Sequence, residues 1–241
     1  GGGGVGQTPD FWDNAYFGGS YFHNGKAVPA KGFCTDVFFD YAKRFITKVK
    51  DSDKPFFVYL CTNAPHGPMH APEKSAKPYA NQGVNVANFL GMIANIDDNV
   101  GAMRAFLKKE GLAENTIFIF TTDNGTSSGA HIHNNGMRGR KGSEYDGGHR
   151  VPFFMHWPKG GLTGGRDVDT ITSYVDVVPT LIDYCRVPSP KGVKFDGVNI
   201  RSLIEGKVKN WPDRILVTDS QRVRDPIKWR KSSVMTDQWR L

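Results

Sequence analysis

The chain has few cysteines and lacks any long apolar run. Its 241 residues include three cysteines, Cys34, Cys61 and Cys185, and no two of them form a Cys-x-x-Cys pair. This number and spacing provide neither a disulfide framework nor a cysteine zinc site. No apolar stretch approaches the roughly 20 residues of a membrane-spanning helix, and no signal peptide is visible. The sequence therefore excludes a disulfide-rich scaffold and a membrane span within this chain.

What is present is the composition of a globular protein. Hydrophobic residues make up 39% of the chain and charged residues 23%, and the mean hydropathy is −0.44. These values allow a sizeable hydrophobic core. The length suits one large domain with an appendage, and no internal repeat is evident.

A formal net charge of +7 raises the question of a nucleic-acid partner. Residues 187–241 contain 12 Lys and Arg but 6 Asp and Glu, so most of the excess lies in this last segment. These basic residues are spread over turns and strands without the aromatic interleaving of an RNA-binding sheet. A solvated surface is the favoured interpretation, and weak attraction to sulfated polysaccharide would use the same charge. No nucleic-acid partner is expected.

Hydrophobic periodicity and capping residues predict the helices. Thr35 should cap the first long helix, and Gly111 should end the second. Ser173 or Asp176 should begin a helix that runs to Cys185. Helices are therefore expected over 36–50, 84–110, 173 or 176 to 185, and 200–205.

Short runs of β-branched and aromatic residues predict the strands. They are expected at 56–61, 116–122, 151–156, 215–218 and 232–236. Residues 1–32 and 62–82 are expected to be loops because they show no hydrophobic period. The alternation of strands and helices indicates an α/β sheet with helices on both faces.

The run 116–120 is followed by residues that suit a cation site. It is β-branched and aromatic, which predicts a strand buried on both faces. Beyond it come Asp123, Asn124 and Gly125, at the edge where ligands gather in an open α/β sheet. A carboxylate and an amide oxygen suit Ca²⁺ or Mg²⁺, and Gly125 would let the chain turn away with positive φ. The alternative is that Asp-Asn-Gly is only a turn signature without chemistry.

Residues 125–148 predict a long functional loop, because they are rich in Gly, Asn, His and Ser and have no hydrophobic period. Arg138, Arg140 and Lys141 supply cations for an anion. The order of residues 136–143 does not match a P-loop. Four glycines allow close approach of the backbone to a ligand: Gly139, Gly142, Gly147 and Gly148.

Several motifs follow one another in a specific order. They include Asp-Asn-Gly at 123–125, Arg-Gly-Arg-Lys-Gly at 138–142 and Gly-Gly-His-Arg-Val-Pro at 147–152. This order resembles that of the sulfatase family of the alkaline-phosphatase superfamily. Three further segments match in the same order, namely Ala-Pro-His-Gly-Pro at 64–68, the helix around 96–101 and the helix start at 174–181.

The resemblance implies a fold and an activity. The fold would be alkaline-phosphatase-like α/β, a mixed sheet flanked by helices on both faces. Residues 1–187 would form part of a catalytic domain, and 188–241 the start of a small C-terminal subdomain. The activity would be hydrolysis of sulfate esters of a small molecule or a carbohydrate, with a formylglycine nucleophile and Ca²⁺ or Mg²⁺. A periplasmic or secreted location would follow from the same resemblance.

The resemblance also implies roles for individual residues. Asp123 and Asn124 would bind the metal ion, and His66 and Lys141 would be catalytic and contact the sulfate. Lys141 would stabilise charge on the leaving group, and His66 would donate a proton. Weaker candidates for substrate contact are His70, His131, His133 and Arg138. The loop of residues 125–148 is called the glycine loop. Three residues are expected only to order it, namely Glu144, Asp146 and Arg150.

The formylglycine motif itself is missing from this chain. In the family, a Cys or Ser is followed by Pro or Ala two places on and Arg four places on, and none of the three cysteines has this context. The family's adjacent aspartates and its Gly-Lys-Trp-His-Leu-Gly segment are also absent. The chain is therefore expected to be a fragment that is inactive alone and binds Ca²⁺ weakly at best. Surface that the missing part would cover is expected to cause self-association or marginal stability.

Two other functions remain open. One is a phosphoesterase or phosphonate hydrolase of the same superfamily, although the single metal half-site favours a sulfatase. The other is a non-catalytic module that binds sulfated glycans, supported by the basic residues of 187–241. Such a module predicts retention on a heparin column at moderate salt.

Overall fold

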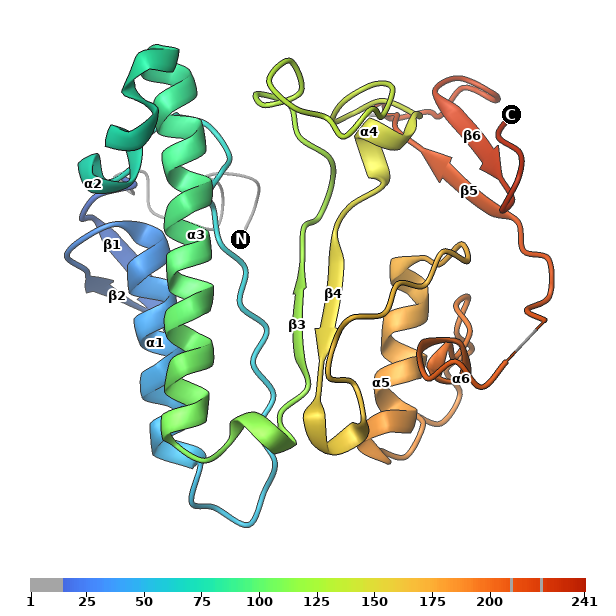
Figure 1. Cartoon of the computed structure of the whole chain (residues 1–241), viewed down its shortest axis with the longest axis horizontal. Coiled ribbons are helices and arrows are strands. Elements are labelled where there is room, and N and C mark those ends of the chain that lie inside the picture. The colour runs from blue at the N-terminus through green and yellow to red at the C-terminus, as the bar shows by residue number, and fades with distance from the viewer. Residues whose placement is uncertain (1–14, 209, 222) are drawn as a thin grey trace. The chain divides into compact units, whose positions relative to one another are not determined.

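The computed structural model describes residues 15–241 except 209 and 222. The chain divides into two compact units between Ala113 and Glu114 (Figure 1). The expected domain boundary between 187 and 188 stays a prediction. Part of the loop expected at 1–32, residues 1–14, lies outside the described residues. No helix in the described part of the chain combines the length and apolarity that a membrane crossing requires.

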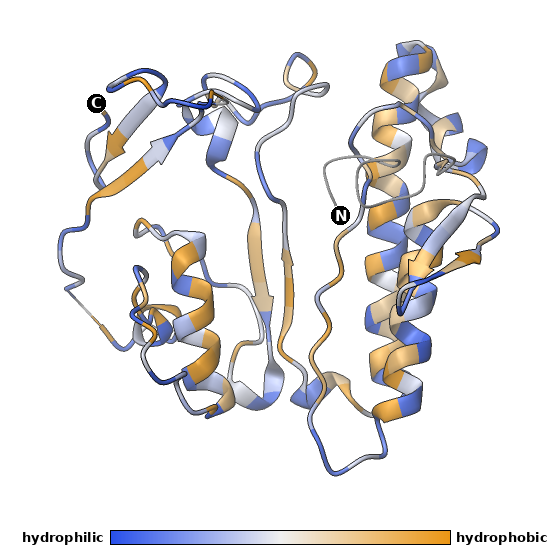
Figure 2. Ribbon diagram, turned by 180° about the vertical axis from the view of Figure 1, so that it is seen from behind, coloured by the Kyte–Doolittle hydropathy of each residue, from blue (hydrophilic) through white to orange (hydrophobic). Residues whose placement is uncertain are grey.

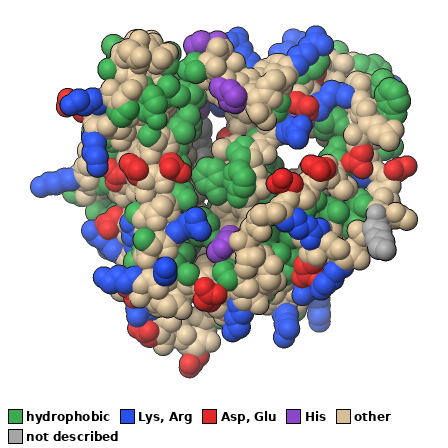
Figure 3. All heavy atoms as spheres, in the orientation of Figure 1, with side chains coloured by type: hydrophobic (Ala, Val, Ile, Leu, Met, Phe, Trp, Pro, Cys, Tyr) green, Lys and Arg blue, Asp and Glu red, His purple; other side chains and the backbone are tan. Residues whose placement is uncertain are grey.

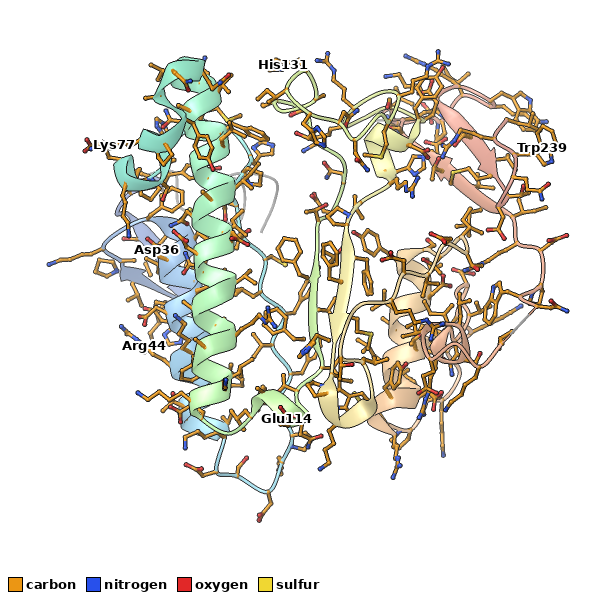
Figure 4. The ribbon with its side chains drawn as sticks, viewed as in Figure 1. Asp36, Arg44, Lys77, Glu114, His131 and Trp239 are labelled. Carbon is orange, nitrogen blue, oxygen red and sulfur yellow. The ribbon has the colours of Figure 1, made fainter. Side chains whose placement is uncertain are left out.

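Two long helices, α1 (Cys34–Val49) and α3 (Val84–Lys109), lie side by side in the first unit (Figure 1). Asp36 of α1 joins them (Figure 4). Its carboxylate accepts a hydrogen bond of 2.9 Å from the amide of Asn95 and one of 2.7 Å from the amide of Asn99. The long helix predicted over 84–110 is confirmed, because α3 covers all but the last of these residues. Gly111 follows it with φ +72°, the left-handed conformation that terminates helices.

Smaller elements and the core complete this unit. A buried aromatic and aliphatic cluster includes Tyr16, Phe33 and Met92, so the N-terminal segment, α1 and α3 share one core. A short helix packs closely on α3, because a Cβ at Gly91 would lie 2.8 Å from the Ala76 backbone. The other elements are α2 (Glu73–Ala76), a 3-10 helix (Lys77–Gln82), and the antiparallel strands β1 (Ser20–His23) and β2 (Lys26–Pro29).

The predicted cap of α1 is wrong. The helix begins at Cys34, with Phe33 in extended conformation at the N-cap position, and no side chain caps it. Thr35 is fully buried, and its hydroxyl has no hydrogen-bond partner among residues 15–241 except 209 and 222. Burial of Phe33 in the core fixes where the chain enters the helix, so packing overrides the local preference of threonine.

Two loop predictions and one strand prediction also fail in this unit. The loop expected at 62–82 contains α2 and the 3-10 helix. The loop expected at 1–32 contains the hairpin β1–β2, whose turn residues Asn24 and Gly25 both have positive φ. Asn-Gly is the favoured pair for such turns, and this signal was present in the sequence. The segment 56–61 belongs to no strand, and Phe57 is exposed.

The second unit contains two antiparallel strand pairs and helices of different lengths (Figure 2). Strand β3 (Phe118–Thr121) pairs with β4 (Phe153–His156), and apolar residues predominate in both. The β3 residues are half-buried or exposed, so the expectation of burial on both faces is wrong. The unit also contains α4 (Asp146–His149), two 3-10 helices (Pro158–Gly160 and Tyr174–Asp176), α5 (Val177–Cys185), α6 (Arg201–Ile204), β5 (Leu216–Asp219) and β6 (Ser232–Met235).

Asp176 joins three segments of the second unit. Ser173 and Asp176 form a reciprocal capping box, so both residues expected to begin this helix take part in its start. The fully buried Asp176 carboxylate also accepts bonds from the Val198 amide, 2.9 Å, and from both Nη atoms of Arg214, 2.5 and 2.6 Å. Burial by itself raises the pKa of Asp176, but these bonds outweigh it and hold the pKa below its ordinary value.

Arg214→Ala should lower the free energy of unfolding by about 3–5 kcal/mol, because Asp176 would remain buried without its cation. Denaturant unfolding followed by circular dichroism measures this loss. The depressed pKa means that the pair stabilises the fold above the unfolded value of about 4 and loses this effect as pH falls through the folded value. The difference between the two proteins should therefore shrink below about pH 4.

The matched control is Arg44→Ala. Arg44 pairs with Asp40 at 2.6 Å, but both side chains are exposed. Its removal should cost less than about 1 kcal/mol. Equal losses for the two variants would contradict the role given to the buried pair.

Candidate functional site

The Asp123–Asn124 turn follows β3 directly and is braced from behind by a tyrosine. The Tyr174 hydroxyl donates to the Thr122 carbonyl and lies 2.8 Å from the Thr121 hydroxyl. Burial raises the pKa of Tyr174, and the nearby Asp123 charge acts in the same direction, so the hydroxyl keeps its proton. Within the described residues, no hydrogen bond or ion pair engages the exposed Asp123 carboxylate or the Asn124 side-chain amide. Both side chains are therefore available as oxygen ligands.

Gly125 is required here because the backbone packs against backbone. The Gly125 amide donates to the Gly148 carbonyl at 3.0 Å. A Cβ at Gly125 would lie 1.9 Å from the Gly147 carbonyl oxygen, and one at Gly147 would lie 2.3 Å from the Gly139 oxygen. Gly125 does not have positive φ, so the predicted reason for glycine at this position is wrong. Close approach of two loop segments is the actual reason.

The same contacts bring Lys141 to the turn. Its backbone amide donates to the Thr126 carbonyl at 2.9 Å, two residues beyond Asn124. Gly139 and Gly142 on either side have φ +81° and +82°, which allows the chain to reverse tightly around Lys141. The Lys141 side chain forms no ion pair with any described residue. The structure thus brings together the metal-ligand candidates and the predicted sulfate-binding lysine in one loop cluster.

The weaker candidates of this loop lie at its surface. His131, labelled in Figure 4, is exposed, and so is His133, whose amide is bonded to the Gly129 carbonyl within a turn. The Arg138 guanidinium lies over the Tyr145 ring, 3.9 Å from its centroid, so Arg138 has a packing role in this loop.

A residue near the end of the chain also holds the glycine loop. Arg240 forms an ion pair with Asp146, donates to the Glu144 carbonyl at 2.9 Å and lies 2.7 Å from His149 Nε2. Burial and then the Arg240 charge lower the pKa of His149. The expectation that Glu144 and Asp146 order the loop agrees with these contacts. Arg240 lies 96 residues from Glu144 in the sequence. A motif of a few residues therefore cannot predict this contact.

His66 and His70 belong to the first unit. The Tyr16 hydroxyl donates to the His66 carbonyl at 2.5 Å, which fixes the backbone of this loop. His66 Nδ1 lies 2.8 Å from the Gly67 carbonyl oxygen, and since a carbonyl can only accept, Nδ1 carries the proton. Nε2 of the exposed imidazole is therefore the ring nitrogen left to face a ligand. The His70 ring lies 6.1 Å from the Tyr16 ring, and a pocket shared by His66 and Lys141 stays a prediction.

The described residues do not form a complete metal centre. Among them, no three His, Cys, Asp or Glu side chains gather as a metal site. Asp123 and Asn124 offer one carboxylate and one amide oxygen, which suit a hard cation but fall short of the six to eight oxygen ligands typical of Ca²⁺. These two residues fit one side of such a site.

Gly125→Ala should destabilise the second unit by about 1–3 kcal/mol, because the new methyl group would overlap the Gly147 carbonyl. Thermal unfolding measures the effect. Gly101→Ala in α3 makes the same chemical change where nothing lies within 4 Å, and it should stabilise by about 0.5–1 kcal/mol. Destabilisation by both substitutions to the same degree would refute the packing argument.

Comparison with known proteins shows similarity to sulfatases over most of the chain. The family model described as Sulfatase matches residues 5–187. The uncharacterized sulfatase YdeN of Escherichia coli K12 is 35% identical over 200 residues, which are 82% of this chain and 35% of that protein. An arylsulfatase of Clostridium perfringens is 29% identical over 203 residues, covering 69% of this chain and 41% of that protein. The chain therefore spans well under half the length of these curated relatives.

A solved structure shows the same fold. The crystal structure of Ps i-CgsB in complex with k-i-k-neocarrahexaose superposes with a TM-score of 0.82 at 27% sequence identity. The match covers 92% of this chain and 48% of that one. The predicted alkaline-phosphatase-like α/β fold is thus confirmed. From the matched family model and these relatives together, we conclude that the chain belongs to the sulfatase family.

Proposed function

We propose that the whole protein that carries this chain hydrolyses sulfate esters, and that this chain contributes a metal-binding turn and a sulfate-facing lysine. One observation carries the proposal. The Lys141 amide is bonded to the Thr126 carbonyl, so an ammonium group and the Asp123 carboxylate, neither of them ion-paired within the described residues, belong to one packed loop cluster. Polar groups left unengaged by their own protein are typical of a site that binds a ligand.

Asp123 and Asn124 would hold Ca²⁺ or Mg²⁺ from one side, with further ligands from elsewhere in the protein. When bound, the cation would neutralise negative charge on the sulfate group. The exposed Asp123, the half-buried Asn124 and the oxygen chemistry of both side chains support this role. The tyrosine brace at the end of β3 keeps the turn in place before a metal binds.

Lys141 would bind a sulfate oxygen and stabilise the charge that develops as the ester bond breaks. Its backbone is fixed by the Thr126 bond and by the glycine contacts, so little reorganisation is needed during the reaction. His66 would protonate the leaving oxygen through Nε2, because Nδ1 is already committed to the Gly67 carbonyl. His70, His133 and Arg138 would contact more distant parts of the substrate.

None of the three cysteines fits the formylglycine motif. Cys34 is fully buried, and burial raises the pKa of its thiol to about 11, so it stays protonated and unreactive at neutral pH. No reaction step is therefore assigned to a nucleophile of this chain.

The substrate we propose is a sulfated carbohydrate. The structure of Ps i-CgsB with a bound neocarrahexaose supports this class. The basic character of residues 187–241 agrees with an anionic polymer as the substrate. A periplasmic or secreted location is proposed on the family resemblance.

Asp123→Asn in the whole protein should reduce kcat/KM for para-nitrophenyl sulfate by about 100-fold or more, because a metal carboxylate is lost. Calorimetry should show a parallel loss of Ca²⁺ affinity. Asp167→Asn, which removes the same charge from an exposed residue of this unit, should change neither quantity by more than about twofold. An Asp123→Asn enzyme that kept full activity and full Ca²⁺ affinity would disprove the metal assignment.

Lys141→Gln should reduce kcat for the same ester by about 10²–10³, the usual cost of removing one charge-stabilising donor. Steady-state kinetics would show the decrease in kcat rather than only in KM. Lys159→Gln is the charge-matched control at an exposed position, and its kcat should remain near that of the unmodified enzyme. Unchanged kcat in Lys141→Gln would remove Lys141 from the mechanism.

A further inference from the structure

A cavity of about 420 Å³ opens beside Lys141, between the glycine loop and the loop that joins β5 to β6. Three cationic residues line it, Lys141 from the first loop and Arg230 and Lys231 from the second. Ser127 and Gln221 add hydroxyl and amide groups to the wall. No carboxylate occurs among the described residues that line it. The volume exceeds what a single sulfate ion fills and suits part of a small organic ligand.

Some basic residues of this unit have a carboxylate partner, whereas the three cations of the cavity have none within the described residues. Arg201, Arg214 and Arg240 each form an ion pair with a carboxylate. On the face drawn in Figure 3, Lys and Arg side chains also alternate with Asp and Glu. By contrast, no described carboxylate forms an ion pair with a cation of the cavity. Positive charge gathered without a counterion creates a potential that attracts an anion from outside the protein.

The wall from the β5–β6 loop is held in a defined shape. Gln221 uses its side-chain amide to bridge the loop, donating to Asp219 Oδ2 at 2.8 Å and to the Ile227 carbonyl at 3.0 Å. Its amide oxygen accepts from the Ile227 amide at 2.9 Å. The Ser220 amide donates to the Lys231 carbonyl at 3.0 Å and closes the base of the loop. These hydrogen bonds hold the backbone that carries Arg230 and Lys231.

The two walls are also tied to each other. The Ser233 hydroxyl of β6 donates to the Glu144 carbonyl of the glycine loop at 3.1 Å. Arg240 reaches the same carbonyl, and its ion pair with Asp146 adds a charged contact. Lys141 and the cations of the hairpin loop therefore keep a fixed separation, as preorganised ligand binding requires.

We propose that this cavity is a second anion subsite, which binds a sulfate or carboxylate group on a sugar residue next to the one whose sulfate ester is cleaved. Arg230 and Lys231 hold the second anion, and Lys141 lies between the two groups. The assignment to a neighbouring sugar rests on the proposed function. The presence of an anion site at this cavity rests on its charge and geometry alone.

Binding of a heparin-derived tetrasaccharide to the full chain, measured by calorimetry, tests the site itself. Lys231→Gln and Arg230→Gln should each weaken binding by about tenfold, since each removes a charged contact. Lys228→Gln is the matched control, because Lys228 lies in the same loop but stands 4.9 Å over the Trp229 ring and does not line the cavity. It should change the affinity by less than about twofold.

The desulfated tetrasaccharide, which keeps its carboxylates, identifies the anionic group. Loss of binding on desulfation assigns the subsite to sulfate, and retained binding that still depends on Lys231 assigns it to carboxylate. Equal weakening by Lys228→Gln and Lys231→Gln would mean diffuse surface charge and would overturn the proposal. The proposal would also be overturned if Lys231→Gln, Arg230→Gln and Lys228→Gln all left the affinity for the tetrasaccharide unchanged.

Kinetics in the whole protein separate this proposal from the proposed function. Lys231→Gln should lower the ratio of kcat/KM for the tetrasaccharide to kcat/KM for para-nitrophenyl sulfate by at least about fivefold. An unchanged ratio would place the cavity outside the substrate path and overturn the neighbouring-sugar assignment. If the unmodified protein hydrolysed neither ester while the binding loss persisted, the sulfatase proposal would fail and the anion site would stand.

Discussion

The second unit depends on direct packing of backbone against backbone at Gly125, Gly147 and Gly148. A Cβ at Gly125 would lie 1.9 Å from the Gly147 carbonyl oxygen, and one at Gly148 would lie 2.2 Å from the Ser143 oxygen. Because no side chains separate the segments, the amide of Gly125 reaches the Gly148 carbonyl and the amide of Lys141 reaches Thr126. Segments with little regular secondary structure besides the short helix α4 thereby become a support for charged side chains.

The elements predicted best were those whose signals are local. Helix α3 is predicted from its length, its apolar residues and Gly111. The helix that ends at Cys185 is predicted to begin at Ser173 or Asp176, and both residues take part in the capping box at its start. Thr35 failed as a cap because the burial of Phe33 decides where α1 begins. The segment 56–61 has the composition of a strand. A strand also needs hydrogen bonds to a neighbouring strand, and composition does not predict that neighbour.

The candidate site shows the same division between local and distant signals. Asp123, Asn124 and Lys141 are predicted as site residues because they stand in motifs a few residues long. The same motifs indicate that Gly125 is needed for the local backbone, although the predicted reason, a positive φ, is wrong. Tyr174 and Arg240 could not be found in this way. Each acts on a residue more than 50 positions away, through hydrogen bonds that only the folded chain creates.

The hairpin β5–β6 is fastened on both sides, before it by the Arg214 pair with Asp176 and after it by Arg240 on the glycine loop. The loop between its strands therefore does not determine where the strands lie. Residues there can be exchanged, inserted or deleted with little strain on the rest of the unit, because the attachments lie outside the exchanged part. The sequence of the loop between β5 and β6 can therefore change to suit other ligands while the glycine loop keeps its sequence.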